Sequence, residues 1–279
     1  MIATTVLFSL GWRHHTNTNP MPHPSIVLDS AVFLFVVPTL LWLLSLKIRD
    51  ASIVDIFWGM GFVGIAWIAM RLGDGAPLRK LWMVSLTTMW GVRLSGYLAW
   101  RNLGKGEDPR YQAMRQRHGE KWPLRSLMIV FLLQAALIFV ISLPLQVAMS
   151  APTPVELGVF DVLGMVLVLC GTACETIADL QLAAWKRHPE HRGKVMQQGL
   201  WRYTRHPNYF GDFLVWWGLF FGALATGSGL WTVLSPLLMS FLLLRVSGVP
   251  LLEKSMNSRP GYAEYVRRTS SFFPRPPRK

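Results

Sequence analysis

The chain has 279 residues, long enough for about one or two domains, and its composition argues against a soluble protein. Hydrophobic residues make up 52% of the chain and charged residues only 15%, against roughly a quarter charged in soluble domains. The mean hydropathy is +0.33, and disordered chains, collagen and disulfide scaffolds are excluded as well. We therefore predict an all-α, polytopic integral membrane protein.

The formal net charge of +13 would suggest nucleic-acid binding in a soluble protein. Here the basic residues gather in a few connecting loops and the C-terminal tail, which the positive-inside bias of membrane proteins explains. We expect no nucleic-acid partner and no metal site. The expected surroundings are membrane lipid, and the expected state is a monomer.

Seven apolar segments follow a polar lead-in that we assign to residues 1–25. A spanning helix needs about 20 apolar residues. The candidate spans are residues 26–46, 52–72, 81–101, 125–147, 156–183, 209–226 and 229–248. Six and eight spans are the alternatives, because the N-terminal stretch and the last hairpin are ambiguous. Residues 26–279 form one domain in this interpretation, with substrate-side helices in 26–150 and a cofactor-binding half in 156–279.

The loop charges predict the orientation of the bundle. Lys and Arg concentrate after the third segment, after the fifth segment and in the tail, whereas residues 148–155 and 227–230 carry none. The positive-inside rule then places the N-terminus outside and the C-terminus in the cytoplasm.

The most informative stretch is residues 199–212, with the sequence GLWRYTRHPNYFGD. It combines Arg202 and Arg205 with histidine, tyrosine, asparagine and aspartate directly before an apolar span. Guanidinium groups bind phosphate or carboxylate through two parallel hydrogen bonds. Pro207 favours a helix start, and the amides that follow favour an anion. The alternative is an ordinary positive-inside loop with interfacial aromatic residues.

The pattern RHPNYFGD after GLWRY resembles the steroid 5-alpha-reductase family, in particular its bacterial DUF1295-type branch. A related RHPxY motif occurs in sterol reductases and in isoprenylcysteine carboxyl methyltransferases. The likeness is strongest over about residues 160–275 and includes the ending RPGYAEYVRRTSSFFP. It implies an all-helical enzyme with seven spans, whose NADPH site faces the cytoplasm.

The resemblance also implies site residues. Asn208 matches the family's cofactor-binding asparagine, Asp179 a cofactor-binding aspartate, and Glu175 stands where the steroid enzymes have asparagine. Glu175 and Asp179 are one helical turn apart, and a carboxylate near a membrane is a functional candidate by default. The alternative for them is an interhelical salt bridge, for example with Arg245. The expected cofactor-binding residues are Glu175, Asp179, Lys186, Arg202, Arg205, His206, Asn208, Tyr209, Asp212 and Arg245.

A second group of polar residues lies in the first half of the chain. Asp55 begins the second segment, and Arg93 and Tyr97 share one face of the third. A buried Asp–Arg pair is the structural alternative. In the steroid enzymes a glutamate and a tyrosine from this region polarise the substrate carbonyl, and Trp90 falls near that tyrosine here. We therefore predict Asp55, Tyr97 and Arg93 as the catalytic group.

These residues together predict an NADPH-dependent reductase that transfers a hydride to the C=C bond of a lipophilic conjugated enone, such as a 3-oxo-delta4-steroid. The first alternative is an S-adenosylmethionine-dependent methyltransferase that resembles the isoprenylcysteine enzymes. Its cofactor carries no phosphate and needs fewer cationic groups than the chain offers. A non-catalytic lipid-binding membrane protein is the second alternative.

Overall fold

The computed structural model describes residues 21–278. The regular secondary structure of this part of the chain is all helical, which confirms the all-α prediction. Most of the N-terminal lead-in, residues 1–20, lies outside the described residues. The helices are α2 (Pro24–Ile48), α3 (Ile53–Leu72), α4 (Pro77–Asn102), α5 (Pro109–His118), α6 (Trp122–Ser126), α7 (Leu133–Ile141), α8 (Leu143–Ala148), α9 (Val159–Arg187), α10 (Pro207–Leu224), α11 (Leu234–Phe241), α12 (Val249–Met256) and α13 (Tyr262–Arg268). Short 3-10 turns cover Gly119–Lys121, Pro189–His191, Gly199–Arg202 and Gly229–Val233, and π-helical turns cover Leu127–Leu132 and Leu242–Val246.

The protein has the character of a multi-pass membrane protein. Five helical stretches are long and apolar enough to cross a bilayer: Pro24–Ile48, Ile53–Leu72, Pro109–Ile141, Val159–Arg187 and Gly229–Lys254. Helices also occupy the other two predicted spans, as α4 and α10, but neither meets this criterion. All seven predicted spans are therefore helical regions in the structure. Five of them are also long and apolar enough to cross a membrane.

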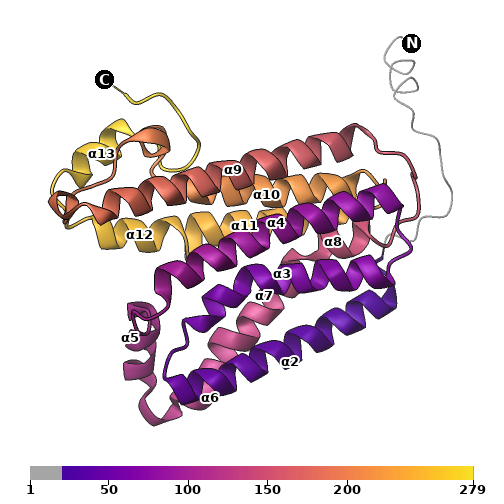
Figure 1. The fold of residues 1–279 in the computed structure, drawn as a ribbon, viewed down its shortest axis with the longest axis horizontal. Coiled ribbons are helices and arrows are strands. Elements are labelled where there is room, and N and C mark those ends of the chain that lie inside the picture. The colour runs from indigo at the N-terminus through magenta and orange to yellow at the C-terminus, as the bar shows by residue number, and fades with distance from the viewer. Residues whose placement is uncertain (1–20, 279) are drawn as a thin grey trace.

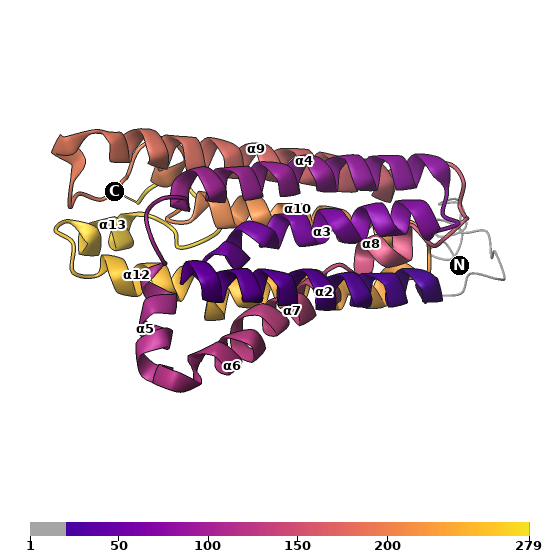
Figure 2. The same ribbon diagram turned by 60° about the horizontal axis from the view of Figure 1, so that its bottom comes forward.

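The long helices run in similar directions, with α4, α9 and α10 side by side along one part of the bundle and α2 and α3 along the other, while the short helix α7 crosses α2 and α3 obliquely (Figures 1 and 2). The fourth predicted span is divided, because Pro144 starts the separate helix α8 just after α7 ends at Ile141. We call the end of the bundle that carries α5 and α13 the basic end, since most of the cationic loops lie there (Figure 1).

Glycines let the helices that carry the polar residues approach closely. A methyl group built on Gly171 of α9 would lie 2.5 Å from the carbonyl oxygen of Gly211 on α10. The same relation joins α3 and α4, where a methyl group on Gly59 would lie 2.5 Å from the Gly91 oxygen. Such contacts hold two backbones at a separation that larger side chains forbid.

Three fully buried aromatic rings fill the middle of the bundle. The rings of Phe62 on α3 and Trp216 on α10 have centroids 4.4 Å apart, and Trp90 on α4 meets Trp216 edge-on at 5.5 Å. These rings pack α3, α4 and α10 together, next to the polar cluster that the next subsection describes.

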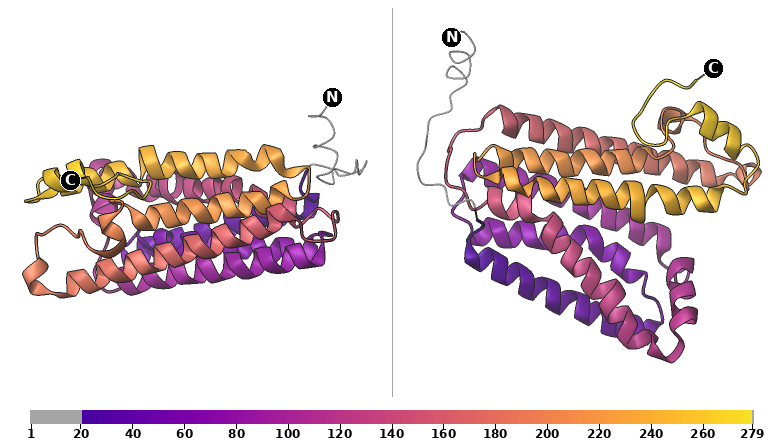
Figure 3. Two further views of the ribbon diagram at one scale, coloured as in Figure 1. Left: turned by 90° about the horizontal axis from the view of Figure 1, so that it is seen from above. Right: turned by 180° about the vertical axis from the view of Figure 1, so that it is seen from behind.

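The C-terminal segment folds back along the basic end (Figures 1 and 3). We call residues 269–278 the C-terminal strap. Its backbone is tied to the loop before α10, because Ser270 O accepts from Arg205 N at 2.9 Å and Arg275 N donates to Tyr203 O at 3.0 Å. The Thr204 hydroxyl adds a bond to Phe272 O at 2.8 Å. We call residues 203–209, which contain the RHPNY sequence and the start of α10, the RHPNY loop. The strap and the RHPNY loop therefore form one unit.

Candidate functional site

A buried cluster of charged side chains joins α4, α9 and α10 near the basic end. Arg93 of α4 contacts Glu175 at 2.7 Å and forms a second, shorter ion pair with Asp179, both carboxylates lying on α9. The indole of Trp90 donates to Glu175 at 2.9 Å. The predicted pairing of the two carboxylates on one helix face is confirmed, and their basic partner is Arg93 rather than Arg245.

Helix α10 adds Asn208 and Asp212 to this cluster. The side-chain amide of Asn208 donates to Asp179 at 3.2 Å, while its Oδ1 atom is buried and accepts no hydrogen bond. Asp212 interacts electrostatically with Arg93 and Asp179, and the Trp216 indole lies next to its carboxylate. Its Oδ1 is buried and accepts no hydrogen bond of regular geometry. Buried acceptors without donors cost free energy unless a ligand or water supplies a donor.

A second ion pair at the opposite end of α4 and α9 shows what a purely structural contact looks like in this fold. Arg79 and Asp161 are both fully buried and meet at 2.8 Å, and Trp82 and Pro154 complete their hydrogen bonds. The Arg93 cluster instead gathers three carboxylates around one guanidinium. That imbalance marks the Arg93 cluster as a candidate functional site.

Cations without carboxylate partners lie next to the cluster. Lys186 lies at the end of α9. Its ammonium group interacts electrostatically with Arg101, Lys105 and Arg259, and also with Asp179. Among the described residues, none of these four cationic side chains forms an ion pair. These four side chains are exposed, and their positive charges favour an anion nearby.

Two tyrosines lie beside these charges. The ring of Tyr97 stacks against the guanidinium groups of Arg93 at 5.6 Å and Arg101 at 5.8 Å, and its hydroxyl feels the charge of Asp179. Tyr209 is close enough to interact with Asp179 and Asp212. The expected face shared by Arg93 and Tyr97 is therefore present.

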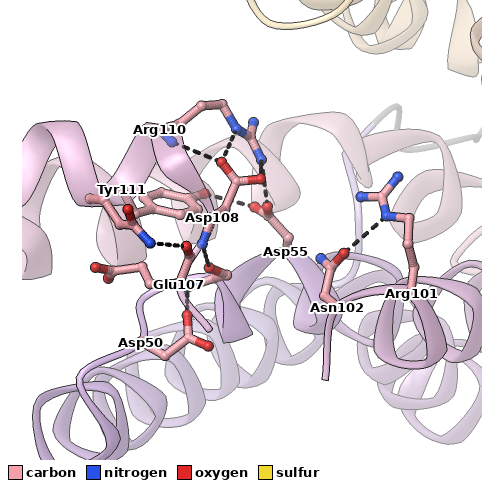
Figure 4. A network of polar contacts seen from close by, with 10 residues as sticks. Asp50, Asp55, Arg101, Asn102, Glu107, Asp108, Arg110 and Tyr111 are labelled. Carbon is pink, nitrogen blue, oxygen red and sulfur yellow. Dashed lines mark hydrogen bonds and ion pairs between the residues drawn. The ribbon is translucent and has the colours of Figure 1, made fainter. Parts of the chain in front are cut away.

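Asp55 does not join that face, so the predicted group of Asp55, Tyr97 and Arg93 is not assembled. Tyr111 donates to Asp55 at 2.7 Å and Arg110 at 2.8 Å (Figure 4). Both partners lie on α5, so Asp55 fastens α5 to the start of α3. The structural alternative, an ion pair between Asp55 and Arg93, is wrong, because Asp55 pairs with Arg110 of α5 and Arg93 pairs with carboxylates of α9.

Neighbouring residues strengthen this α5 clamp, which we define as Asp55, Glu107, Arg110, Tyr111 and Arg115. Glu107 accepts from Ala51 N at 2.9 Å and pairs with Arg115 at 2.7 Å. Burial alone would raise the pKa of Glu107, but the bonds from Arg115 and Ala51 outweigh it and lower this pKa. Glu107 therefore stays ionised at neutral pH.

The remaining predicted cofactor residues have other positions. Arg205 pairs with Glu253 at 2.5 Å and donates to Thr269 O at 2.7 Å, so its guanidinium holds α12 and the strap. His206 stacks on Tyr209 and lies 3.4 Å from Glu253. Arg202 and Arg245 are exposed, and no ion pair involves either of them in the described part of the chain.

Burial gives His206 an unusual charge state. Desolvation lowers the pKa of His206 to about 4, against the opposing effect of Glu253 and with the help of Arg205. The imidazole is therefore neutral at pH 7, and its stacking on Tyr209 is that of an uncharged ring.

Sequence reasoning missed Arg101, Lys105 and Arg259 as members of the cationic group. Arg101 ends the third apolar segment, Lys105 follows it and Arg259 follows the seventh, so each looks like an ordinary positive-inside charge. The available signal was position: all three lie at the same predicted membrane face as Lys186.

Comparisons with known proteins agree with the likeness only at the coarsest level. The family model described as protein of unknown function DUF1295 matches residues 41–269. This chain belongs to the DUF1295 family. A relative from Schizosaccharomyces pombe, described as an uncharacterised protein, is 27% identical over 293 residues, which cover 93% of this chain and 81% of the relative. That relative is fungal, so the comparison gives no support to a specifically bacterial branch. No solved structure matches this DUF1295 chain significantly.

Proposed function

We propose that this DUF1295 protein is a membrane-embedded, NADPH-dependent reductase of a lipophilic conjugated enone, such as a 3-oxo-delta4-steroid. The observation that carries the proposal is the Arg93 cluster, with its excess of carboxylates and unpaired acceptors, beside four unpaired cations. In this proposal all seven helical regions span the membrane, and the basic end faces the cytoplasm.

The chain's own groups fit the two chemical ends of a reduced dinucleotide phosphate. The unpartnered Oδ1 atoms of Asn208 and Asp212 suit a carboxamide or ribose hydroxyl donor, as does the carboxylate of Asp179. The group of Lys186, Arg101, Lys105 and Arg259 suits a pyrophosphate and an additional ribose phosphate. That extra phosphate favours NADPH over NADH, because each added negative charge gains from an unneutralised cationic group.

When bound, NADPH supplies a hydride to the β-carbon of the enone. Tyr97 is the side chain we assign to donate a hydrogen bond to the substrate carbonyl oxygen, where negative charge develops. Arg93 supports this role because its guanidinium lies against the Tyr97 ring. The α-carbon takes its proton from water, so that one hydride and one proton saturate the bond. Asp55 acts in this proposal through the α5 clamp and not on the substrate.

The surrounding helices suit an apolar substrate. The rings of Phe62, Trp90 and Trp216 lie beneath the cluster and keep the polar groups away from bulk water. Exclusion of water strengthens electrostatic contacts and protects a hydride step. Substrate would enter from the bilayer, and the charged cofactor from the basic end.

A thermal-shift titration of the detergent-purified protein with NADPH, NADH and S-adenosylmethionine tests the proposal. A ligand that binds only the folded state stabilises it by about 2.7 kcal/mol at a hundredfold excess over its dissociation constant. We expect a rise in melting temperature with NADPH and a smaller one with NADH. A rise with S-adenosylmethionine alone would favour the methyltransferase, and no rise with any of the three would favour a non-catalytic lipid-binding protein.

The variant that locates the site is Asn208→Ala. It removes the free acceptor and the bond to Asp179, and we expect NADPH affinity to fall by about tenfold or more. Gln134→Ala is the matched control, since it removes a side-chain amide from α7, outside the cluster. Unchanged NADPH affinity in folded Asn208→Ala protein would refute this placement of the cofactor.

A further inference from the structure

Two surface cavities, each of about 380 Å³, lie between the C-terminal strap and the elements beneath it. The first lies against the loop before α10 and is lined by Arg202 and Arg268 together with uncharged residues. The second lies along the strap, and five arginines line it: Arg205, Arg267, Arg268, Arg275 and Arg278. Among the residues that the structure describes, no carboxylate lines either cavity.

Most of these guanidinium groups are free to bind a ligand. Arg205 is the exception, because Glu253 and the Thr269 carbonyl already hold it. Arg268 has only a long contact of 3.8 Å with the exposed Glu264. No ion pair among the described residues involves Arg202, Arg267 or Arg275. An unoccupied arginine fork suits phosphate oxygens through two parallel hydrogen bonds.

The walls of the cavities are fixed in place. Arg278 N donates to Arg268 O at 2.9 Å, and Arg275 N donates to Tyr203 O at 3.0 Å, so both ends of the strap are tied down. The hydroxyl of Tyr265 on α13 donates to Trp201 O at 2.5 Å. The arginines therefore project from a rigid frame, and binding costs less ordering of the backbone.

The cavities lie away from the Arg93 cluster. The indole of Trp201 donates to Ala178 O and the amide of Leu200 donates to the side chain of Gln181, which attaches the loop to one side of α9. Asp179 points from a different side of α9 toward Arg93 on α4. Since positions 179 and 181 are about 200° apart around a helix, Arg202 and the Asp179 carboxylate serve different surfaces.

An apolar anchor lies next to the basic cavities. Phe272 and Phe273 of the strap pack against Phe210 and Phe213 of α10, with ring centroids 5.5 to 6.1 Å apart. Phe273 nevertheless leaves 50% of its surface exposed. Exposed aromatic rings beside arginines, at the first turns of an apolar helix, are typical of a membrane–water interface.

We propose that the strap cavities bind the phosphate group of an anionic phospholipid headgroup. The arginines take the phosphate oxygens, while Phe273 lies among the upper parts of the acyl chains. A free phosphate would satisfy the arginines equally but would gain nothing from the exposed ring. The arrangement therefore favours the lipid as the source of the phosphate, and lipid binding stabilises the unit formed by the strap and the RHPNY loop.

Native mass spectrometry of the full chain in neutral detergent tests this proposal, with phosphatidylglycerol and phosphatidylcholine as probes. We expect wild-type protein to bind phosphatidylglycerol in preference. Each basic residue near a lipid surface contributes roughly fivefold in affinity, so Arg202→Gln combined with Arg268→Gln should weaken that binding by about 20-fold. The matched control is Arg117→Gln with Arg125→Gln, two exposed arginines outside both cavities, which should change it little. Equal weakening in both double variants, or none in either, would overturn the proposal.

Two further measurements distinguish the source of the phosphate and the role of the cavities. Phe273→Ser should weaken phosphatidylglycerol binding and leave competition by inorganic phosphate unchanged. If inorganic phosphate competes at concentrations similar to the lipid, and Phe273→Ser has no effect, the site binds a free anion. The proposal that a lipid headgroup occupies it would then be wrong. Arg267→Gln combined with Arg268→Gln removes two cavity arginines that are not among the expected cofactor residues, and this variant should keep its NADPH-induced thermal shift. Loss of that shift with lipid binding intact would assign the cavities to the cofactor site instead.

Discussion

At the scale of single residues, Arg93 is the cation of a buried, charged cluster. It compensates two buried carboxylates directly, and its side chain is only 16% exposed. Removing one partner of a buried ion pair leaves uncompensated charge, which typically costs about 3 to 5 kcal/mol. The cluster is therefore expected to depend on Arg93 for folding as well as for any ligand.

We predict that Arg93→Gln lowers the free energy of unfolding by about 3 kcal/mol, measured by thermal or denaturant unfolding in detergent. The double variant Arg93→Gln and Glu175→Gln should recover part of this loss, because it removes one of the uncompensated charges. If the double variant is less stable than the single one, the pairing is not the source of the effect.

His206 predicts a dependence of stability on pH. Its pKa falls to about 4 in the folded protein, below the ordinary value of about 6.5 in an unfolded chain. The unfolded state therefore takes up a proton first, and the protein should lose stability as the pH falls from about 6.5 to 4. His206→Gln should flatten this part of the profile of melting temperature against pH. A profile unchanged by the substitution would show that Glu253 or other carboxylates cause the acid sensitivity.

At the scale of elements, the contact between α9 and α10 positions the cluster. Asp179 and Asn208 meet because Gly171 and Gly211 let the two helices touch. Gly171→Val would place a side chain about 2.5 Å from a backbone oxygen, and we expect a loss of several kcal/mol, on the order of 3 or more, from overpacking. Gly96→Ala is the control, since a methyl group there meets nothing within 4 Å. Equal stability of the two variants in a thermal melt would argue against this close contact.

The α5 clamp predicts the effect of changing Asp55. Asp55→Asn and Tyr111→Phe each weaken the same attachment, so both should increase tryptic cleavage near Lys105 and lower stability by about 1 kcal/mol. If the protein catalyses the proposed reduction, both variants should change its turnover to a similar, small extent. A large loss of turnover in Asp55→Asn alone would instead return Asp55 to the catalytic group.

At the scale of the whole molecule, the proposed topology can be tested by fusion proteins in a bacterial host. A fluorescent protein fused to the C-terminus should fluoresce, and alkaline phosphatase fused after residue 152 should be active, because the proposed topology places the two positions on opposite sides of the membrane. Alkaline phosphatase activity at the C-terminus would contradict the proposal. Either the orientation would be wrong, or the number of spans between the two fusion sites would not be odd.

Sequence alone was sufficient for the membrane class, for helices at all seven predicted segments and for the positions of Glu175 and Asp179 on one helix face. These properties follow from composition and from periodicity within one segment, both of which are local. The predicted boundaries differ from the observed ones by a few residues: α4 begins at Pro77 rather than 81, and α10 begins at Pro207 rather than 209 and so takes Asn208 into the helix. Its helix start could still be anticipated, because proline favours the first helical turn.

Tertiary structure alone decided which charges meet. Arg93 pairs with Glu175 and Asp179, more than 80 residues away, and Asp55 pairs with α5 rather than with Arg93. It also brought Arg101, Lys105 and Arg259 to Lys186, and laid the C-terminal strap against the RHPNY loop. The partners of a charge depend on how helices distant in sequence pack together, and that packing is set by glycine contacts and buried rings from several helices at once.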